Sequence, residues 1–373
     1  LSEEAGQPFA AMGALANLCF NLLEEGRLGE AEALAQEALA RHVDRRGRPL
    51  PVVGILYAPL AVLAYMRDDL AAAEAYAREG LALSRHLLSR SMLGGDAEMT
   101  LALVHFARGE LEQACAVLAE ARRAAEATHV QVVAARLALQ EATLRLRAGD
   151  IAAAERYLAG AGHQALVGSP ADRERRQLLQ ARLALAHEET ATGRATLAAL
   201  ARQAAASGRR SRLVQIHVLQ ALAARQAADD AAALEHLRDA LAIAATEGYR
   251  RVFLDAGQPV VEMLPRVRAV APDFVDDLLA RAASRPGPSA AAATPQPAAP
   301  SPPSPSLLIE PLSERELEIL HLIGQGFSNQ AIADRLVITV GTAKWHLSNI
   351  YGKLGVRSRT QALARARELG LLV

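Results

Sequence analysis

The stretch GELEQA, Gly109 to Ala114, recurs with small changes at nearly regular intervals. Its clearest copies are GRLGEA at 26–31, DDLAAA at 68–73 and GDIAAA at 149–154, and DDAAAL at 229–234 is a weaker one. The apolar third residues of the four clear copies follow one another after 42, 41 and 40 positions: Leu28, Leu70, Leu111 and Ile151. A period near 40 in a chain rich in alanine and leucine predicts stacked helix pairs.

The motif has the composition of a tight turn between two helices. Gly or Asp at its start ends the first helix or caps the second, and a small residue three positions on lets the helices approach closely. Further copies are expected near residue 191, where ATGRATLAAL is degenerate, and near Ala231. An ordinary helical bundle with chance similarity is the alternative, which the near-equal gaps disfavour.

The period exceeds the roughly 34 residues of the standard tetratricopeptide repeat, and the Trp-Leu-Gly-Tyr positions of that consensus are missing. We therefore expect tetratricopeptide-like pairs with longer helices. Such a stack presents a concave surface suited to a ligand or a peptide. No cluster of polar residues marks a pocket in the sequence.

The overall composition favours an all-α protein. The chain has 373 residues, of which 51% are apolar and only 3% aromatic, so alanine and leucine must supply the core. The net charge is zero, so a nucleic-acid surface would have to be local. The two cysteines, Cys19 and Cys115, are expected to be buried free thiols rather than a disulfide. No apolar run is long enough for a membrane span, and we expect a cytoplasmic protein.

A compositional break divides the chain. Eight prolines fall between Arg285 and Pro305, with Ala, Ser and Gly among them, and such a segment cannot pack a core. A flexible linker is favoured over a Pro-rich recognition peptide. We predict a repeat domain at 1–283, a linker at 284–306 and a C-terminal domain at 307–373.

The C-terminal segment contains the boundary residues of four short helices. Ser313 and Glu316 form a capping box, and Gly324 and Gly326 end the first helix. Three further N-caps are expected at Ser328, Thr339 and Ser358. The predicted buried residues are Leu317, Leu320, Leu322, Ile323, Ile332, Ala333, Leu336, Ala343, Leu347, Ile350, Leu354, Ala362, Leu363, Ala366 and Leu369.

The third of these helices, about 339–354, has an unusual outward face. At 100° per residue its apolar residues form one stripe, and Trp345 and Ser348 lie opposite that stripe. Trp345 is the sole tryptophan, and Lys344 and Lys353 are the only lysines. A solvent-facing Trp indicates a contact surface, either for a ligand or for another domain or subunit.

Charge favours nucleic acid as the ligand. From Arg335 to the C-terminus there are seven basic residues and one acidic residue, a net charge of +6 over 39 positions. This is the electrostatic pattern of a surface that binds a phosphate backbone. A short helix, a turn and a capped second helix form a helix-turn-helix, whose second helix enters the major groove.

The segment 312–372 resembles the LuxR-type helix-turn-helix of bacterial transcription regulators. The matching motifs are LSERELEIL (312–320), GFSNQAIADRL (326–336), TxxTxKxH (339–346), NIYGKLGV (349–356) and RSRTQA (357–362). Ala343 departs from the branched residue usual before the lysine. GYRRVFLDAGQPVVEML (248–264) resembles the end of the sensor region in the large MalT-like LuxR regulators.

The resemblance implies roles for the matched positions. Base readout falls to Lys344, Trp345 and Ser348. Contacts with the DNA backbone fall to Asn329, Thr342, Asn349, Lys353, Arg357 and Arg359. His346 and Tyr351 lie beside the buried stripe and are read as packing residues.

Regulators of this family usually carry an N-terminal ATP-binding module of the signal-transduction NTPase type. The phosphate-binding loop of such a module requires Gly-Lys-Ser/Thr, and the sole Gly-Lys here is followed by Leu354. No cofactor is therefore expected in this chain; ATP would belong to an N-terminal domain absent here. The start at Leu1, rather than Met, is consistent with a fragment.

The predicted function is that of a bacterial DNA-binding transcription regulator whose repeats sense an effector or a protein partner. Double-stranded DNA, a second copy of the chain and RNA polymerase are the expected partners, with no membrane, and DNA binding would place the protein on the nucleoid. The alternative is a protein-interaction scaffold with a vestigial DNA-binding module. An enzyme is disfavoured because no two of the ten histidines are four residues apart and no catalytic constellation is visible.

Overall fold

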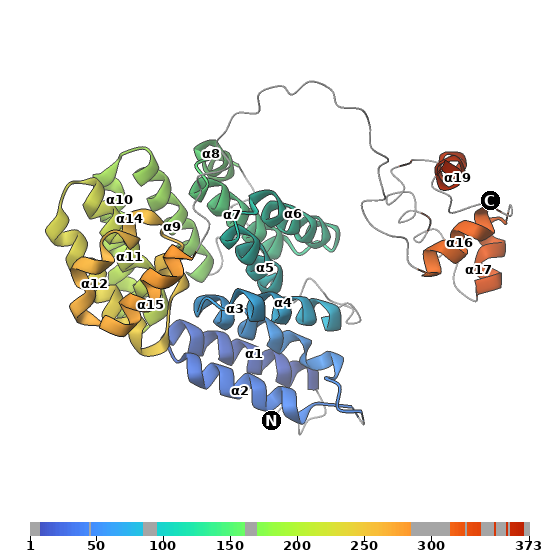
Figure 1. Cartoon of the computed structure of the whole chain (residues 1–373), viewed down its shortest axis with the longest axis horizontal. Coiled ribbons are helices and arrows are strands. Elements are labelled where there is room, and N and C mark those ends of the chain that lie inside the picture. The colour runs from blue at the N-terminus through green and yellow to red at the C-terminus, as the bar shows by residue number, and fades with distance from the viewer. Residues whose placement is uncertain are drawn as a thin grey trace. The chain divides into compact units, whose positions relative to one another are not determined.

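The computed structural model describes residues 8–44, 46–84, 95–160, 170–284, 314–324, 327–336, 347, 356 and 359–368. The chain separates into two compact units, Leu1–Ala291 and Ala292–Val373. Regular structure in the described residues is helical (Figure 1), with one isolated antiparallel bridge between Val43 and Pro49. The predicted all-α class is therefore confirmed. Among the described helices, none has the length and apolar character of a membrane span.

Six helix pairs make up most of the first unit. They are α1 (Pro8–Glu25) with α2 (Leu28–Arg41), α3 (Tyr57–Met66) with α4 (Leu70–Ser84), α5 (Asp96–Ala107) with α6 (Leu111–Ala127), α7 (Gln131–Arg147) with α8 (Ile151–Ala159), α9 (Pro170–Ala186) with α10 (Thr190–Ala206), and α11 (Arg210–Gln226) with α12 (Asp230–Glu247). A short 3₁₀ helix, η1 (Pro51–Leu56), precedes α3. Successive helices pack on one another, as predicted for a tetratricopeptide-like stack.

The recurring motif forms the turn inside each pair. Gly109 has a φ of +84°, its N–H donates to the Phe106 carbonyl at 3.0 Å, and the Glu110 N–H donates to the His105 carbonyl at 3.0 Å. These two bonds define a Schellman motif, which satisfies carbonyls at the end of the first helix. The same pair of bonds and a positive φ recur at Gly26, Asp68, Gly149, Glu188 and Ala228.

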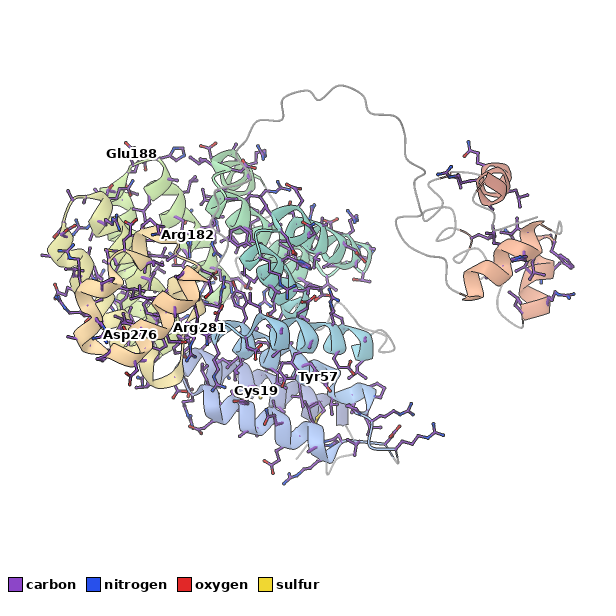
Figure 2. The ribbon with its side chains drawn as sticks, viewed as in Figure 1. Cys19, Tyr57, Arg182, Glu188, Asp276 and Arg281 are labelled. Atoms are coloured by element: carbon purple, nitrogen blue, oxygen red, sulfur yellow. The ribbon has the colours of Figure 1, made fainter. Side chains whose placement is uncertain are left out.

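The second helix of each pair begins where the motif predicts. The apolar third residue of every clear copy is the first residue of a helix, and the degenerate copies start helices at Thr190 and Asp230. These two copies were hard to recognise because Glu188 (labelled in Figure 2) and Ala228 replace glycine at the left-handed position. The Asp150 side chain accepts a hydrogen bond from the Ala153 N–H at 3.1 Å, which confirms the capping role.

A small residue occupies the fourth position of each second helix, and it is buried in all six pairs. These residues are Ala31, Ala73, Ala114, Ala154, Gly193 and Ala233. At Gly193 an added Cβ atom would lie 2.8 Å from Leu185 Cδ2 on the preceding helix. The helices of a pair therefore approach as closely as the small residues allow.

The end of the first unit packs against its beginning (Figure 1). After α12 come α13 (Arg251–Leu254), α14 (Gln258–Val261), the 3₁₀ helix η4 (Leu264–Val270) and α15 (Pro272–Ala283). One buried cluster joins Leu22 and Leu63 of the first pairs to Val218 and Phe253 near the end. The Arg250 N–H also donates to the Met66 carbonyl at 2.9 Å. The stack therefore closes on itself through a shared core.

The second unit contains α16 (Glu314–Gly324), α17 (Asn329–Leu336) and α19 (Arg359–Glu368), with α16 packed against α19. Predicted core residues that are buried include Leu320, Leu322, Ile323, Ile332, Leu347, Ala362 and Ala366. Ile319 is also buried but was not predicted. The Ala331 N–H donates to Ser328 Oγ at 3.2 Å, so Ser328 caps α17 as expected. Of the predicted third helix, only Leu347 belongs to the described residues, and it is helical.

Cys19 and Cys115 are free thiols and both are buried, as predicted. Burial raises the pKa of each thiol above its ordinary value. Both residues therefore behave as small core residues rather than as reactive nucleophiles.

Candidate functional site

A cavity of about 320 Å³ lies among the first helices of the pairs. Its lining comes from α1, α3, α5, α7, α9, α11 and the residues around α13, while second helices contribute none of it. A neighbouring cavity of about 200 Å³ shares Gln140, Arg182 and Gln215 with the first. The closure of the stack brings these widely separated helices around one space, whose size is at the lower end of ligand pockets.

The larger cavity is rich in arginine. Its charged lining residues are Arg147, Arg175, Arg182, Arg212 and Arg251, against Glu24 and Asp255. Sequence reasoning found no polar pocket, because these arginines come from four different helices and resemble the many surface arginines when taken one at a time. Their convergence becomes visible only in three dimensions.

Asp255 is the centre of a buried polar network at the cavity wall. The Tyr65 hydroxyl donates to Asp255 Oδ2 at 2.7 Å, and Arg147 Nη2 lies 3.3 Å from Asp255 Oδ1. Arg251 also pairs with Asp255 and reaches Asp68 Oδ1 at 3.0 Å. Burial by itself would raise the pKa of Asp255, but the charges of Arg147 and Arg251 outweigh it and hold that pKa below its usual range.

Further arginines around the two cavities pair with buried carboxylates. Arg136 Nε and Arg175 Nη1 lie 2.9 and 3.1 Å from Asp172 Oδ1, and Arg212 Nε lies 2.9 Å from Glu174 Oε1. Asp172 is 0% exposed and Glu174 is 1% exposed. Neither carboxylate belongs to the cavity lining, and each offsets part of the positive charge of the two arginines that it contacts.

Arg182 differs from these neighbours. It lines both cavities, yet it forms no hydrogen bond or ion pair with any described residue. Figure 2 shows it among the helices of the first unit. Burial, followed by the charge of Arg147 and then that of Arg212, lowers the pKa of the Arg182 guanidinium to about 9, although Asp255 opposes the shift. Arg182 therefore remains a cation at neutral pH, with its donors unused by the protein.

Asp96 adds a titratable group to the smaller cavity. Burial raises the pKa of Asp96 to about 6, although the charges of Arg175 and Arg136 act in the opposite direction. Part of the Asp96 population is therefore protonated just below neutral pH, which makes the cavity more positive as the pH falls.

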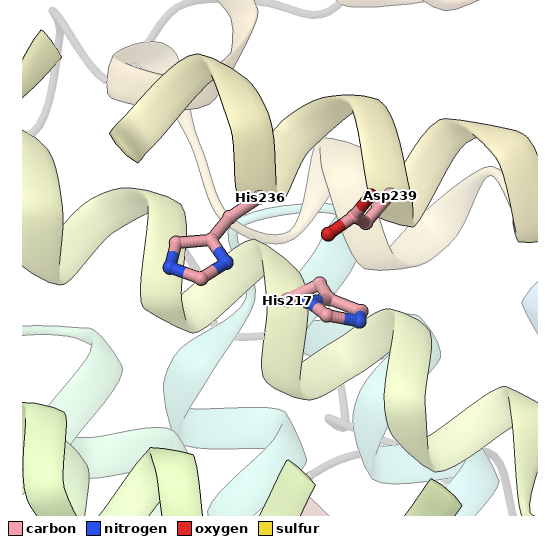
Figure 3. Close-up of side chains that lie close together, drawn as sticks. All are labelled: His217, His236 and Asp239. Atoms are coloured by element: carbon pink, nitrogen blue, oxygen red, sulfur yellow. The ribbon is translucent and has the colours of Figure 1, made fainter. Parts of the chain in front are cut away.

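A separate cluster lies between α11 and α12. His217, His236 and Asp239 each offer an atom suited to metal coordination, and these atoms lie within 4.8 Å of one another (Figure 3). The two rings stack with centroids 5.9 Å apart, and burial lowers the pKa of both. Sequence reasoning missed the pair because the histidines are 19 residues apart on neighbouring helices. Both rings are therefore biased toward the neutral form.

Two of the nine predicted DNA-contacting residues belong to the described part of the chain. Asn329 is the first residue of α17 and is partly buried, and Arg359 is the first residue of α19. The others lie outside the described residues: Thr342, Lys344, Trp345, Ser348, Asn349, Lys353 and Arg357. Their roles, and the outward direction of Trp345, stay predictions.

The stacked helix pairs and the short helices after them lie in two regions that match two families. The family described as the MalT-like TPR region matches residues 1–269, and the luxR family of bacterial regulatory proteins matches residues 310–366. The chain belongs to the MalT-like TPR family and carries a LuxR-family DNA-binding domain. Neither matching family is an enzyme family.

Curated relatives resemble a small part of the chain. The response regulator protein VraR of Staphylococcus aureus (strain NCTC 8325 / PS 47) is 52% identical over 65 residues, which are 17% of this chain and 31% of VraR. The VraR proteins of Staphylococcus epidermidis and Staphylococcus saprophyticus match with the same identity and coverage. The chain thus spans 31% of the length of these relatives.

Proposed function

We propose that the C-terminal unit binds double-stranded DNA by inserting the helix of residues 339–354 into the major groove. The luxR-family match over residues 310–366 is the observation that carries this proposal, and the Ser328-capped start of α17 agrees with it. In this proposal Lys344, Trp345 and Ser348 read base edges. The DNA backbone is held by Asn329, Thr342, Asn349, Lys353, Arg357 and Arg359.

The helical repeats are the sensor in the same proposal. The cavity among the first helices is where an effector binds, because it is enclosed by helices from both ends of the closed stack. Residues 1–283 form the sensor, 284–306 a linker, and 307–373 the DNA-binding domain. The protein acts in the cytoplasm, with RNA polymerase as a further partner. It binds repeated half-sites as a dimer, because one such module buries little DNA surface.

Selection of bound DNA from a random pool, with the full chain as bait, tests this function. We expect an enriched motif with two half-sites. The double variant Lys344→Ala, Trp345→Ala should lose discrimination between that motif and a scrambled sequence at fixed salt. A matched control is Arg202→Ala, an exposed arginine of α10, which removes positive charge without touching the proposed recognition helix.

Enrichment of no motif, or full discrimination by the double variant, would refute the readout. Unchanged unfolding of the double variant, followed by temperature, shows that its loss of binding is not a loss of structure. A chain that folds but selects no DNA would favour the alternative of a protein-interaction scaffold.

A further inference from the structure

Among the arginines that line the larger cavity, one guanidinium group has no hydrogen-bond or ion-pair partner in the described residues. Arg147 pairs with Asp255, Arg175 with Asp172 and Arg212 with Glu174. Arg182 lies among them with no ion pair to any described residue, although it lines both cavities. An arginine held in a cavity without a carboxylate is the reverse of what stability by itself would favour.

The surroundings of Arg182 are unfavourable for its positive charge. The charges of Arg147 and Arg212 act against the Arg182 cation, and its half-buried position reduces its contact with water. An oxyanion beside Arg182 would reverse both effects. A planar guanidinium donates two parallel hydrogen bonds to a carboxylate or a phosphate, which gives direction as well as attraction.

The other lining residues indicate the chemical character of the rest of the ligand. Gln140 and Gln215 supply amide groups to both cavities, and Gln215 accepts a hydrogen bond from Arg212 Nη1 at 2.6 Å. Val62 and Leu103 provide apolar surface to both cavities. A cavity of about 320 Å³ with this lining fits a small organic molecule that bears an anionic group.

We propose that the effector of the sensor is a small organic oxyanion, whose carboxylate or phosphate binds the Arg182 guanidinium inside the cavity. This inference rests on the proposed sensing function of the repeats and specifies the chemistry of what they sense. Because α1 and α3 line the cavity at one end of the stack and the residues around α13 line it at the other, an occupied cavity holds the two ends of the stack together. Binding is therefore expected to stabilise the closed form.

Thermal unfolding of the full chain tests the site, with pyrophosphate and citrate as separate probes and chloride holding the ionic strength constant. We expect at least one probe to raise Tm along a saturable curve, and the more effective one identifies phosphate or carboxylate as the preferred group. Arg182→Gln should weaken that binding roughly 10- to 100-fold, the effect of losing hydrogen bonds to a charged group. Arg182→Lys keeps the charge without the bidentate geometry, so its affinity for the probe should lie between those of the wild type and Arg182→Gln.

Arg202→Gln is the matched control, because it removes an arginine from the exposed face of α10 and should leave the binding curve unchanged. Without any probe, Arg182→Gln should unfold at a higher temperature than the wild type, because it relieves an unpaired charge. This second readout keeps the test decisive even if the variant changes the cavity.

A saturable rise in Tm for neither probe, or equal affinities for the wild type and Arg182→Gln, would overturn the proposal. The DNA selection separates this failure from failure of the proposed function. Motif enrichment without an anion-dependent Tm would remove the anion site and leave DNA recognition standing. An anion-dependent Tm without motif enrichment would support the anion site and refute DNA recognition.

Discussion

The turns of the helix pairs and the wall of the cavity are built on opposite principles. Each turn is made by hydrogen bonds between residues three to five positions apart, and the same pattern recurs six times. In the cavity wall, Arg251 bonds to Asp68 across 183 positions and Tyr65 to Asp255 across 190. The turns repeat because local geometry is enough to specify them, whereas each contact in the wall occurs once and depends on the whole stack.

The largest effect is expected from breaking the wall. Arg251 is 2% exposed and pairs with Asp68 and Asp255, so Arg251→Met removes the buried arginine that these two half-buried carboxylates share and leaves them only Arg281 and Arg147. We expect a loss of about 3–5 kcal/mol in the free energy of unfolding, measured by urea denaturation.

Arg266→Met is the control for that variant. Arg266 and Asp230 form an exposed pair at 2.7 Å, so its removal should cost less than about 1 kcal/mol. Similar losses for the two variants would contradict the view that closure of the stack depends on the buried network.

A smaller effect is expected from crowding a helix pair. In Gly193→Ala the new methyl group would meet Leu185 Cδ2 at 2.8 Å, so we expect a loss of about 1–3 kcal/mol from overpacking. Gly13→Ala in α1 has no neighbour within 4 Å and should gain about 0.5–1 kcal/mol. Thermal unfolding of both variants compares them, and a stabilised Gly193→Ala would show that the helices can separate at little cost.

The pH dependence of stability probes the interface of α11 and α12. Burial lowers the pKa of His217 and His236, so the folded state favours neutral rings. Their contribution to stability is complete above the unfolded histidine pKa, about 6.5, and is lost as the pH falls through that value toward the folded pKa. Protonation of Asp96, whose pKa burial raises to about 6, acts in the opposite direction over this range, so the histidine contribution is measured as the difference between the wild type and His217→Gln, His236→Gln. Between pH 7.5 and 5.5 the free energy of unfolding should change more unfavourably in the wild type than in the double variant. An unchanged slope in the double variant would assign the dependence to other groups.

The smallest effect sharpens the comparison at the turns. Ala228 has a φ of +57°, which glycine adopts without strain, so Ala228→Gly should stabilise the protein by about 0.5–1 kcal/mol. Gly208→Ala is the reverse experiment at a φ of +68° with open space around the new methyl group, and it should destabilise by about 1 kcal/mol. Calorimetry can resolve the two shifts, which should have opposite signs if backbone conformation alone decides them.

The C-terminal core was predictable because helical periodicity marks one face of each short helix. Leu320, Ile332, Leu347 and Ala366 are buried as expected. Ile319 was missed because it lies beside the predicted apolar stripe, and helical periodicity does not specify how wide the buried face of the helix is. The predicted DNA-contacting roles rest on the motif resemblance and on the placement of residues 339–354 at 100° per residue, and the selection experiment will test them.

The sequence by itself determined the helix pairs, their period and the places where they turn, because Schellman turns, caps and small-residue contacts involve neighbours along the chain. Only the tertiary structure decided the closure of the stack, the cavity and the isolation of Arg182. Nothing local distinguishes Arg182 from the exposed Arg202. The difference arises when helices distant in sequence surround one guanidinium, reduce its contact with water and leave it without an ion pair among the described residues.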